Sequence, residues 1–271
     1  MVSIFIDSLS GVTEERCKIF FGTGEEIRIF PYLFNIEGKE VLTSEVSARE
    51  IMIMKGKGVE VKTSRPALNV WKEMIIEEYE KGKDVLYIAS TSKMTGALQA
   101  VKVIGNLLKN DYPDRTLEII DTGFTTIYIE AILYSLIGVP NKMENLIEAV
   151  KKSISSAHAK IALTSTKTIV ENNRFEQISF KFPVIDMKDG MVIIDREFDT
   201  QKEAVEYIKS LMSLSKDHPN FLLSTFSPDF NKEDASEVLK DLPYDIELQA
   251  NEMNSCMLTY LGEHSIGYAW F

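Results

Sequence analysis

Short apolar strands that alternate with amphipathic helices constrain the first half of this 271-residue chain. Val2–Ile6, Val85–Ala89 and Leu117–Ile120 are brief apolar runs, and such runs are typical of strands buried on both faces. Between them, Leu68–Tyr79 has apolar residues at three- and four-residue spacing, which predicts an amphipathic helix. Ala97–Leu108 is predicted as a second helix. This alternation favours βαβ units, and therefore an α/β fold with a parallel sheet covered by helices on both faces.

Other segments of the first half add strands and helices to this pattern. We expect a strand over Ile27–Phe34 that turns at a glycine into a return segment near Glu40–Leu42. Val46–Met54 is predicted as a short helix, and a longer helix is expected from Thr125 to Leu136.

The second half has a different pattern, in which hairpins mix with helices. Pro183–Met187 and Met191–Asp195 flank Lys188-Asp189-Gly190, which is a hairpin signal. Further helices are expected over Met143–Ile154, Glu203–Met212 and Lys232–Leu239, and extended segments over Lys160–Leu163, Phe221–Ser224 and Asp245–Leu248. The chain exceeds the ~100–200 residues of a typical domain. We therefore predict two domains, an α/β domain over residues 1–150 and a smaller α+β domain over residues 151–271.

The composition is that of a globular protein with a sizeable core, at 45% hydrophobic and 26% charged residues. The net charge is −11 and no basic run occurs, so we expect no nucleic-acid partner. The two cysteines, Cys17 and Cys256, are too few for a disulfide framework. We expect both to be buried free thiols.

The beginning of the chain and its longest apolar stretch argue against export and membrane insertion. Asp7 follows only six residues, and no charged segment precedes the apolar run, so the start is predicted as a strand rather than a signal peptide. The stretch near Ile127–Val139 is interrupted by Glu130 and is shorter than the ~20 residues of a membrane span. We expect a cytoplasmic protein.

Small hydroxyl residues follow three of the predicted strands. They occur in Asp7-Ser8, in Thr91-Ser92 with Thr95-Gly96, and in Asp121-Thr122. Ligands of open parallel sheets bind at the carboxyl ends of the strands. The start of the helix after Gly96 offers unpaired N–H groups that favour an anion. The sequence therefore predicts one anion site at this edge, and Thr63 and Ser64 join it if their loop folds over the same edge.

Other roles for these residues remain open at this stage. Ser92 and Thr95 could simply cap the following helix, and Ser64 is a good candidate for the N-cap of the helix over Leu68–Tyr79, with Pro66 in its first turn. Ser92 could act as a nucleophile with His264 as its base, but no G-x-S-x-G motif surrounds it. The three histidines are scattered, and no metal site is predicted.

At these residues the chain resembles the DegV family of bacterial fatty-acid-binding proteins over essentially its full length. The family's opening strand with Asp-Ser resembles Ile6-Asp7-Ser8, and its Thr-Ser-x-Pro-Ser segment resembles Thr63-Ser64-Arg65-Pro66-Ala67. Its Ser-x-x-Ser-Gly-Thr loop is similar to Ser92-Lys93-Met94-Thr95-Gly96-Ala97, and the end of its third strand is similar to Ile120-Asp121-Thr122. The specificity comes from the order and spacing of these motifs together.

The resemblance implies a carrier that encloses one long-chain fatty acid between its two domains and is not itself an enzyme. The carboxylate would be held by the hydroxyls of Thr63 and Ser92 and by backbone near Thr95-Gly96. The family's Gly-Gly-Arg segment resembles Asn172-Asn173-Arg174, and its C-terminal histidine resembles His264. The predicted ligand-binding residues are Thr63, Ser64, Ser92, Thr95, Gly96, Arg174 and His264. No cofactor is implied.

The resemblance also implies a partner, a dihydroxyacetone-kinase-like fatty acid kinase that phosphorylates the bound acid. Three departures bear on this partner and on the site. Ala67 replaces a serine, Asp199 stands where the family usually has an arginine, and residues 264–268 keep the histidine but lose the proline of the family's His-x-Gly-Pro-Gly ending. Two alternatives therefore stay open: an enzyme acting on a small anionic substrate at the same strand ends, and a regulatory protein without a ligand.

Overall fold

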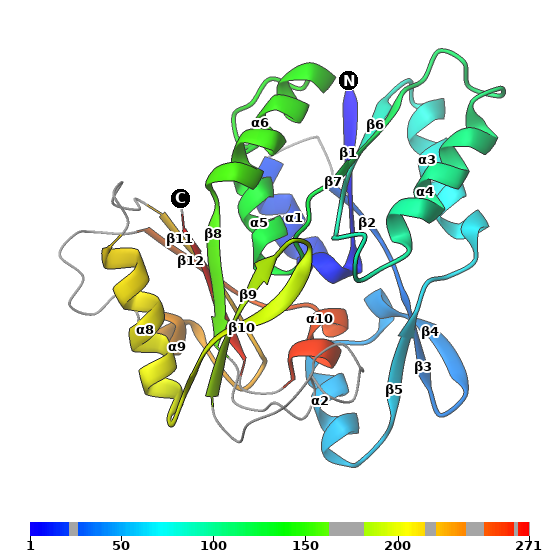
Figure 1. Ribbon diagram of the computed structural model, residues 1–271. Helices are drawn as coiled ribbons and strands as arrows, with labels where there is room; N and C mark the ends of the chain where they lie inside the picture. The colour runs from blue at the N-terminus through cyan, green and yellow to red at the C-terminus, as the bar shows by residue number, and fades with distance from the viewer. Residues whose placement is uncertain (22–26, 163–181, 215–220, 237–246, 263–264, 271) are drawn as a thin grey trace.

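A four-stranded parallel sheet forms the centre of the first half of the protein (Figure 1). The computed structural model describes residues 1–21, 27–162, 182–214, 221–236, 247–262 and 265–270. The strands are β1 (Val2–Asp7), β2 (Ile27–Phe30), β6 (Asp84–Ala89) and β7 (Leu117–Asp121), in the order β2-β1-β6-β7. All three pairings are parallel, which confirms the predicted parallel sheet.

Helices cover both faces of this sheet, as predicted. On one face, Phe5 and Tyr87 pack in a core cluster with residues of α3 (Leu68–Glu80) and α4 (Ala97–Leu108). On the other face, Ile4, Ile6 and Leu86 share a cluster with α5 (Ile127–Tyr134) and α6 (Met143–Ser156). Cys17 of α1 (Glu14–Phe21) joins the second cluster. The strands are apolar on both sides because each side faces a helix layer.

A small antiparallel sheet stands beside the parallel sheet and was not predicted in this form. It consists of β3 (Leu33–Ile36), β4 (Lys39–Leu42) and β5 (Val61–Ser64), in the order β4-β3-β5. The prediction of one strand over Ile27–Phe34 was wrong, because Pro31 lacks the N–H that would continue the ladder. The chain changes sheets at Pro31-Tyr32. Helix α2 (Ala48–Gly56) lies between β4 and β5 in the chain.

The predicted capping role of Ser64 was also wrong. Ser64 is the last residue of β5, where it pairs with Leu33, and the N-cap of α3 is Ala67, which makes no side-chain capping bond. The two residues between them include Pro66, whose ring restricts the preceding residue to extended backbone. The strand therefore ends before the helix can use a hydroxyl from Ser64.

A second, six-stranded and mostly antiparallel sheet dominates the second half. Its order is β10-β9-β8-β13-β11-β12, and only β11 and β12 pair in parallel. The strands are β8 (His158–Ala162), β9 (Phe182–Lys188), β10 (Met191–Phe198), β11 (Phe221–Phe226), β12 (Glu247–Glu252) and β13 (Ile266–Trp270). The predicted hairpin is confirmed as β9 and β10. The boundary near residue 150 stays a prediction.

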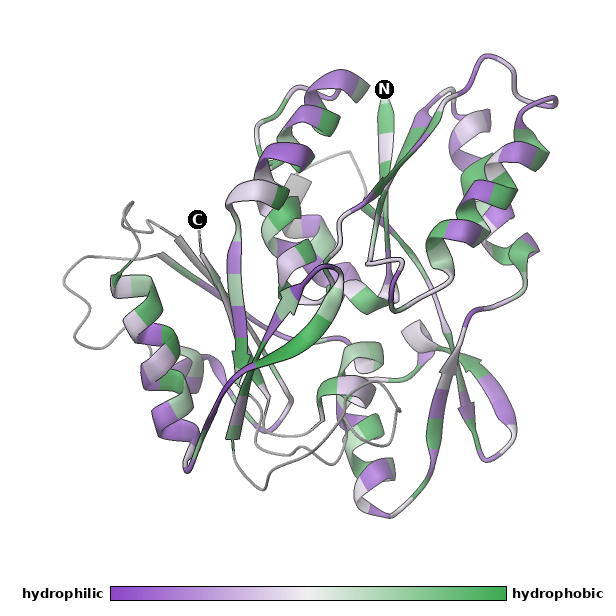
Figure 2. Ribbon diagram, viewed as in Figure 1, coloured by the Kyte–Doolittle hydropathy of each residue, from purple (hydrophilic) through white to green (hydrophobic). Residues whose placement is uncertain are grey.

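Two helices flank this sheet, and a third joins it to the first half. Helices α8 (Gln201–Ser213) and α9 (Lys232–Ser236) contribute Ala204, Ile208 and Ala235 to a core cluster with the sheet. Figure 2 shows hydrophilic and hydrophobic residues side by side on α8, as expected of an amphipathic helix. Helix α10 (Ser255–Leu261) packs against α2 instead. No helix in the described ranges is both long and apolar enough to span a membrane.

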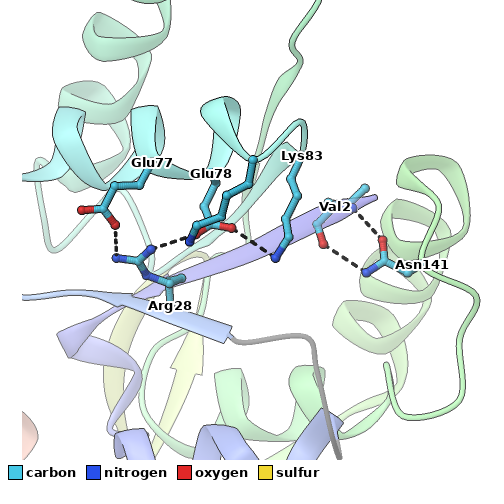
Figure 3. Close-up of polar contacts among 7 residues, drawn as sticks. Val2, Arg28, Glu77, Glu78, Lys83 and Asn141 are labelled. Carbon is cyan, nitrogen blue, oxygen red and sulfur yellow. Dashed lines mark hydrogen bonds and ion pairs between the residues drawn. The ribbon is translucent and has the colours of Figure 1, made fainter.

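Polar contacts join the strands of the parallel sheet to the segments around them (Figure 3). Arg28 of β2 contacts Glu77 and Glu78 of α3 at 2.9 and 2.8 Å, and Lys83 contacts Glu78 at 3.3 Å. The Asn141 amide accepts a hydrogen bond from the Val2 backbone N–H and donates one to the Val2 carbonyl, at 2.7 and 3.1 Å. Asn141 thus makes both bonds that a neighbouring strand would make.

The Glu78 ion pairs predict a loss of stability at acid pH. Burial would raise the pKa of Glu78, but hydrogen bonds from Lys81 and Arg28 and the charge of Lys83 outweigh burial and lower the pKa to about 2 from 4.5. Because the folded-state pKa is the lower one, the contribution is complete above pH 4.5 and disappears as the pH falls towards 2. Urea unfolding of Glu78→Gln should therefore show less change in stability between pH 5 and 2.5 than the wild type. If the free energy of unfolding changed equally in the two proteins between pH 5 and 2.5, the result would contradict this assignment.

Candidate functional site

The Asp7 carboxylate joins the ends of the two central strands. Its two oxygens accept hydrogen bonds from the backbone N–H groups of Leu9 and Ser90, from the Ser90 hydroxyl and from the Tyr87 phenol, at 2.6–3.0 Å. The side chain is fully buried. Burial raises the pKa of Asp7, and the hydrogen bonds from Tyr87 and Ser90 oppose that rise. Asp7 therefore positions the loop after β6, and its oxygens are already occupied.

Three other hydroxyls from the predicted strand-end site also have internal partners. The Ser8 hydroxyl donates to the Phe30 carbonyl at 3.1 Å, and the Thr122 hydroxyl donates to the Ala89 carbonyl at 2.8 Å. Thr91 donates to the Gly190 carbonyl in the β9–β10 turn at 2.8 Å. These residues are buried, and they hold strand ends and loops together.

Ser92 is exposed and is paired with the end of the neighbouring strand. Its hydroxyl donates to the Asp121 carboxylate at 2.5 Å, and its backbone N–H donates to the same carboxylate at 3.3 Å. The one hydroxyl proton of Ser92 is used in this bond. A ligand carboxylate placed at Ser92 would also meet the negative charge of Asp121.

Thr95 lies in the same loop and turns towards a buried tyrosine. Its Oγ1 lies 2.6 Å from the phenol oxygen of Tyr32, and it accepts a hydrogen bond from the Ala97 backbone N–H at 3.2 Å. Tyr32 occupies the connection between β2 and β3 and is 4% exposed. Gly96 is the N-cap of α4 and is exposed, so this loop ends at an open helix start.

Thr63 reaches the same region from β5. It pairs with the buried Phe34 across the small sheet, and cross-strand partners lie on the same face. Its hydroxyl contacts the phenol of Tyr260 in α10. Ser64 is the next residue along the strand, so its side chain points to the opposite face, and it is exposed. The predicted pair Thr63 and Ser64 is therefore split between two faces.

Thr63 and Thr95 are each paired with a tyrosine, Tyr260 and Tyr32 respectively. Burial, and then the negative charge of Asp7, raise the pKa of Tyr32 well above its usual range, against the opposing effect of its hydrogen bond with Thr95. Cys256 and Tyr260 raise it further, which places Tyr260 within electrostatic range of Tyr32. We call Thr63, Tyr260, Tyr32 and Thr95 the hydroxyl cluster. It combines residues of β5, α10, the β2–β3 connection and the loop before α4.

Sequence reasoning singled out Thr63 and Thr95 but missed both tyrosines. Tyr32 lies in a segment that the sequence predicts as one strand. Tyr260 lies in a helix whose residues are nearly all buried, so the sequence of that helix shows no amphipathic period. A tyrosine after Pro31, where a strand must be interrupted, was the available signal. Arg174 and His264 lie outside the described residues.

A cavity of about 420 Å³ is lined in part by Pro31, the residue before Tyr32. Its wall includes Ser8 and Thr43, whose hydroxyls accept hydrogen bonds from the Tyr32 N–H at 3.2 Å each. Glu14 and Glu252 also line it, and their charges would repel a carboxylate. The charges in the wall of this cavity therefore disfavour an anionic ligand there.

Comparison with known proteins identifies the family. The model of the DegV family, described as uncharacterised protein, matches residues 1–271. The chain belongs to the DegV family. A search of curated proteins found no match.

Solved DegV structures share the fold. A DegV family protein from Thermus thermophilus, described by its fatty acid binding, is 17% identical with a TM-score of 0.82 over 100% of this chain and 99% of the other. DegV of Bacillus subtilis, described as a fatty acid binding protein, is 16% identical with a TM-score of 0.82 over 99% and 98%. A stearic acid-binding protein from Eubacterium ventriosum is 16% identical, with a TM-score of 0.82 over 100% of this chain and 98% of the other.

In this DegV protein the β9–β10 turn closes onto the loop before α4. Gly190 has φ +79°, and a Cβ there would lie 2.7 Å from Thr91 Oγ1 and 2.9 Å from Lys93 Cγ. Glycine is therefore required by both backbone conformation and space. Within the described ranges, no group of three or more His, Cys, Asp or Glu side chains could hold a metal ion.

Asp7→Asn should destabilise the protein by about 2–4 kcal/mol, because the new NH₂ group would face two hydrogen-bond donors whichever way the amide turns. The exposed Asp121, at the end of the adjacent strand, provides a matched control, and Asp121→Asn should change stability by less than about 0.5 kcal/mol. Urea denaturation at pH 7 measures both. Similar small effects for the two variants would argue against the Asp7 clamp.

Proposed function

We propose that this protein binds one long-chain fatty acid and holds its carboxylate at the hydroxyl cluster, chiefly through Thr63 and Thr95. The observation that carries this proposal is that the two hydroxyls, from distant segments, each pair with a tyrosine, Tyr260 and Tyr32, and that Tyr260 acts electrostatically on Tyr32. Membership of the DegV family and the fatty acids named for its solved relatives support the ligand class. Neutral hydroxyl donors suit the two acceptor oxygens of a carboxylate.

The acyl chain would supply most of the affinity. Burying ~14–16 methylenes at ~0.8 kcal/mol each corresponds to ~11–13 kcal/mol before the costs of ordering and association are subtracted. The hydroxyls then determine which end of the ligand lies at the protein edge. Ser92 takes a secondary place in this proposal because its proton is donated to Asp121, and Gly96 would contribute backbone only. Arg174 and His264 stay as proposals from their motifs.

The family resemblance further supports a carrier that presents the bound acid to a separate kinase for acyl-phosphate formation. The position of the head group at a loop before a helix start, rather than in a closed interior, fits such a transfer. This step is tested by adding a purified dihydroxyacetone-kinase-like fatty acid kinase with ATP and trapping acyl phosphate with hydroxylamine. Hydroxamate that forms only when this protein is present would support the carrier role. A reaction that yields no hydroxamate would contradict that role.

The ligand itself is tested by solvent extraction of the purified protein and mass spectrometry. We expect a long-chain fatty acid near one per chain. An empty extract, together with no binding of added fatty acids, would contradict the proposal and favour a small-anion site.

The head-group site is tested with Thr63→Val and Thr95→Val, which keep the side-chain shape but remove the hydroxyl. Each should weaken fatty-acid binding by about tenfold or more, because a hydrogen bond to a charged group is lost. Ser64→Ala is the matched control, since Ser64 neighbours Thr63 on the opposite face, and it should bind as the wild type does. Displacement of a fluorescent fatty acid measures all three. If Thr63→Val, Thr95→Val and Ser64→Ala all bound the fatty acid with equal affinity, the carboxylate would have to bind elsewhere.

A further inference from the structure

We infer that Tyr32 is a positioning residue that fixes Thr95 as a hydrogen-bond donor and so makes the site selective for a deprotonated carboxylate over neutral head groups. This inference rests on the proposed fatty-acid site and names the feature that sets its head-group specificity. Three features support it: the hydrogen bonds that the Tyr32 and Thr95 hydroxyls make, the burial of Tyr32, and the one proton that each hydroxyl has to donate.

The direction of the bond between Tyr32 and Thr95 follows from burial. The phenol oxygen of Tyr32 has Thr95 Oγ1 as its only hydrogen-bond partner among the described residues, at 2.6 Å. If Thr95 donated to Tyr32, the phenol proton would be buried without an acceptor, which is costly. The favourable arrangement therefore has Tyr32 donating to Thr95.

That arrangement leaves Thr95 with a single role. A hydroxyl oxygen has two acceptor lone pairs and one proton. Thr95 Oγ1 accepts from the Ala97 N–H at 3.2 Å and from Tyr32, so both lone pairs are in use. Only its proton is left, and a ligand at Thr95 must accept it.

The Tyr32 ring has little freedom to leave this position. It stacks on Trp71 with ring centroids 5.8 Å apart and 16° between the planes, and the Trp71 indole N–H donates to the Pro31 carbonyl at 2.9 Å. The Tyr32 backbone N–H is held by Ser8 and Thr43. Burial and the charge of Asp7 raise the pKa of Tyr32, which keeps the phenol protonated as a donor.

A fixed donor distinguishes between head groups by their own protons and charge. A carboxylate has acceptor oxygens only, and hydrogen bonds to a charged acceptor are roughly twice as strong as neutral ones. A methyl ester accepts the same proton without the charge, and a primary alcohol brings a proton for which Thr95 has no lone pair left. Tyr32 should therefore favour the acid over both.

The experiment compares Tyr32→Phe with the wild type for a fatty acid, its methyl ester and the primary alcohol of equal chain length. We expect the acid to bind about five- to tenfold more weakly to the variant, as for loss of one hydrogen bond, and the ester and alcohol to change by less than about twofold. Tyr79→Phe is the matched control, because Tyr79 is equally buried in the same core cluster and its phenol makes no hydrogen bond to the described residues. It should leave all three affinities unchanged.

A double-mutant cycle shows whether Tyr32 acts through Thr95. Adding Tyr32→Phe to Thr95→Val should weaken acid binding no further. An equal loss for acid, ester and alcohol in Tyr32→Phe, with a lowered melting temperature, would show that Tyr32 acts by packing and would overturn the inference. An unchanged affinity of Tyr32→Phe for the acid would also overturn the inference. Wild-type protein that binds no fatty acid would overturn the proposed function, and this inference with it, whereas failure in the variant alone leaves the proposed function intact.

Discussion

The buried Asp7 carboxylate is the interaction on which the arrangement of the site depends. A charge removed from water is tolerated only when its lone pairs are satisfied, and Asp7 meets this requirement through Leu9, Tyr87 and Ser90. These donors belong to β6 and to the segments that follow β1 and β6. The bonds therefore fix where the chain leaves β6 and begins the loop to α4. Thr95 lies in that loop, so its position depends on a carboxylate whose oxygens are already occupied by internal donors.

In the proposed site, an anion would bind to a protein of net charge −11 without a cation among the described head-group residues. Hydroxyl protons would take the place of a charged partner, and the burial of Tyr32 would strengthen their hydrogen bonds. Lys62, the residue before Thr63 in β5, forms an ion pair with Glu60 at 3.0 Å, and Arg65, just after the strand, lies over the Trp71 ring at 5.8 Å. On this proposal, selectivity would come from the number of protons offered to the head group, and affinity from the buried methylenes.

The sequence predicts best those parts of the structure in which the interacting residues are close together in the chain. The strands Val2–Asp7 and Asp84–Ala89 and the helix Ala97–Leu108 follow from local apolar patterns, whereas a site at their polar ends stays a prediction. The pairing of Thr63 with Tyr260, 197 residues apart, leaves no trace in either segment. Ser92 and Asp121 were both singled out as strand-end residues, but only the parallel register of β6 and β7 shows that they would bond to each other.

Glu130 shows the same limit, and it takes part in one of the contacts between the two halves. In the sequence it only interrupts an apolar stretch, yet it is buried and forms an ion pair with Arg16 of α1 at 2.8 Å. Burial raises the pKa of Glu130, and the charge of Arg16 opposes the rise. Arg16 also donates to Gln249 of β12 at 3.4 Å, so one buried cation links two helices of the first half to the second sheet. A buried pair is expensive to break. This link therefore holds β12 and the following α10 in place, and with α10 the phenol of Tyr260 against Thr63.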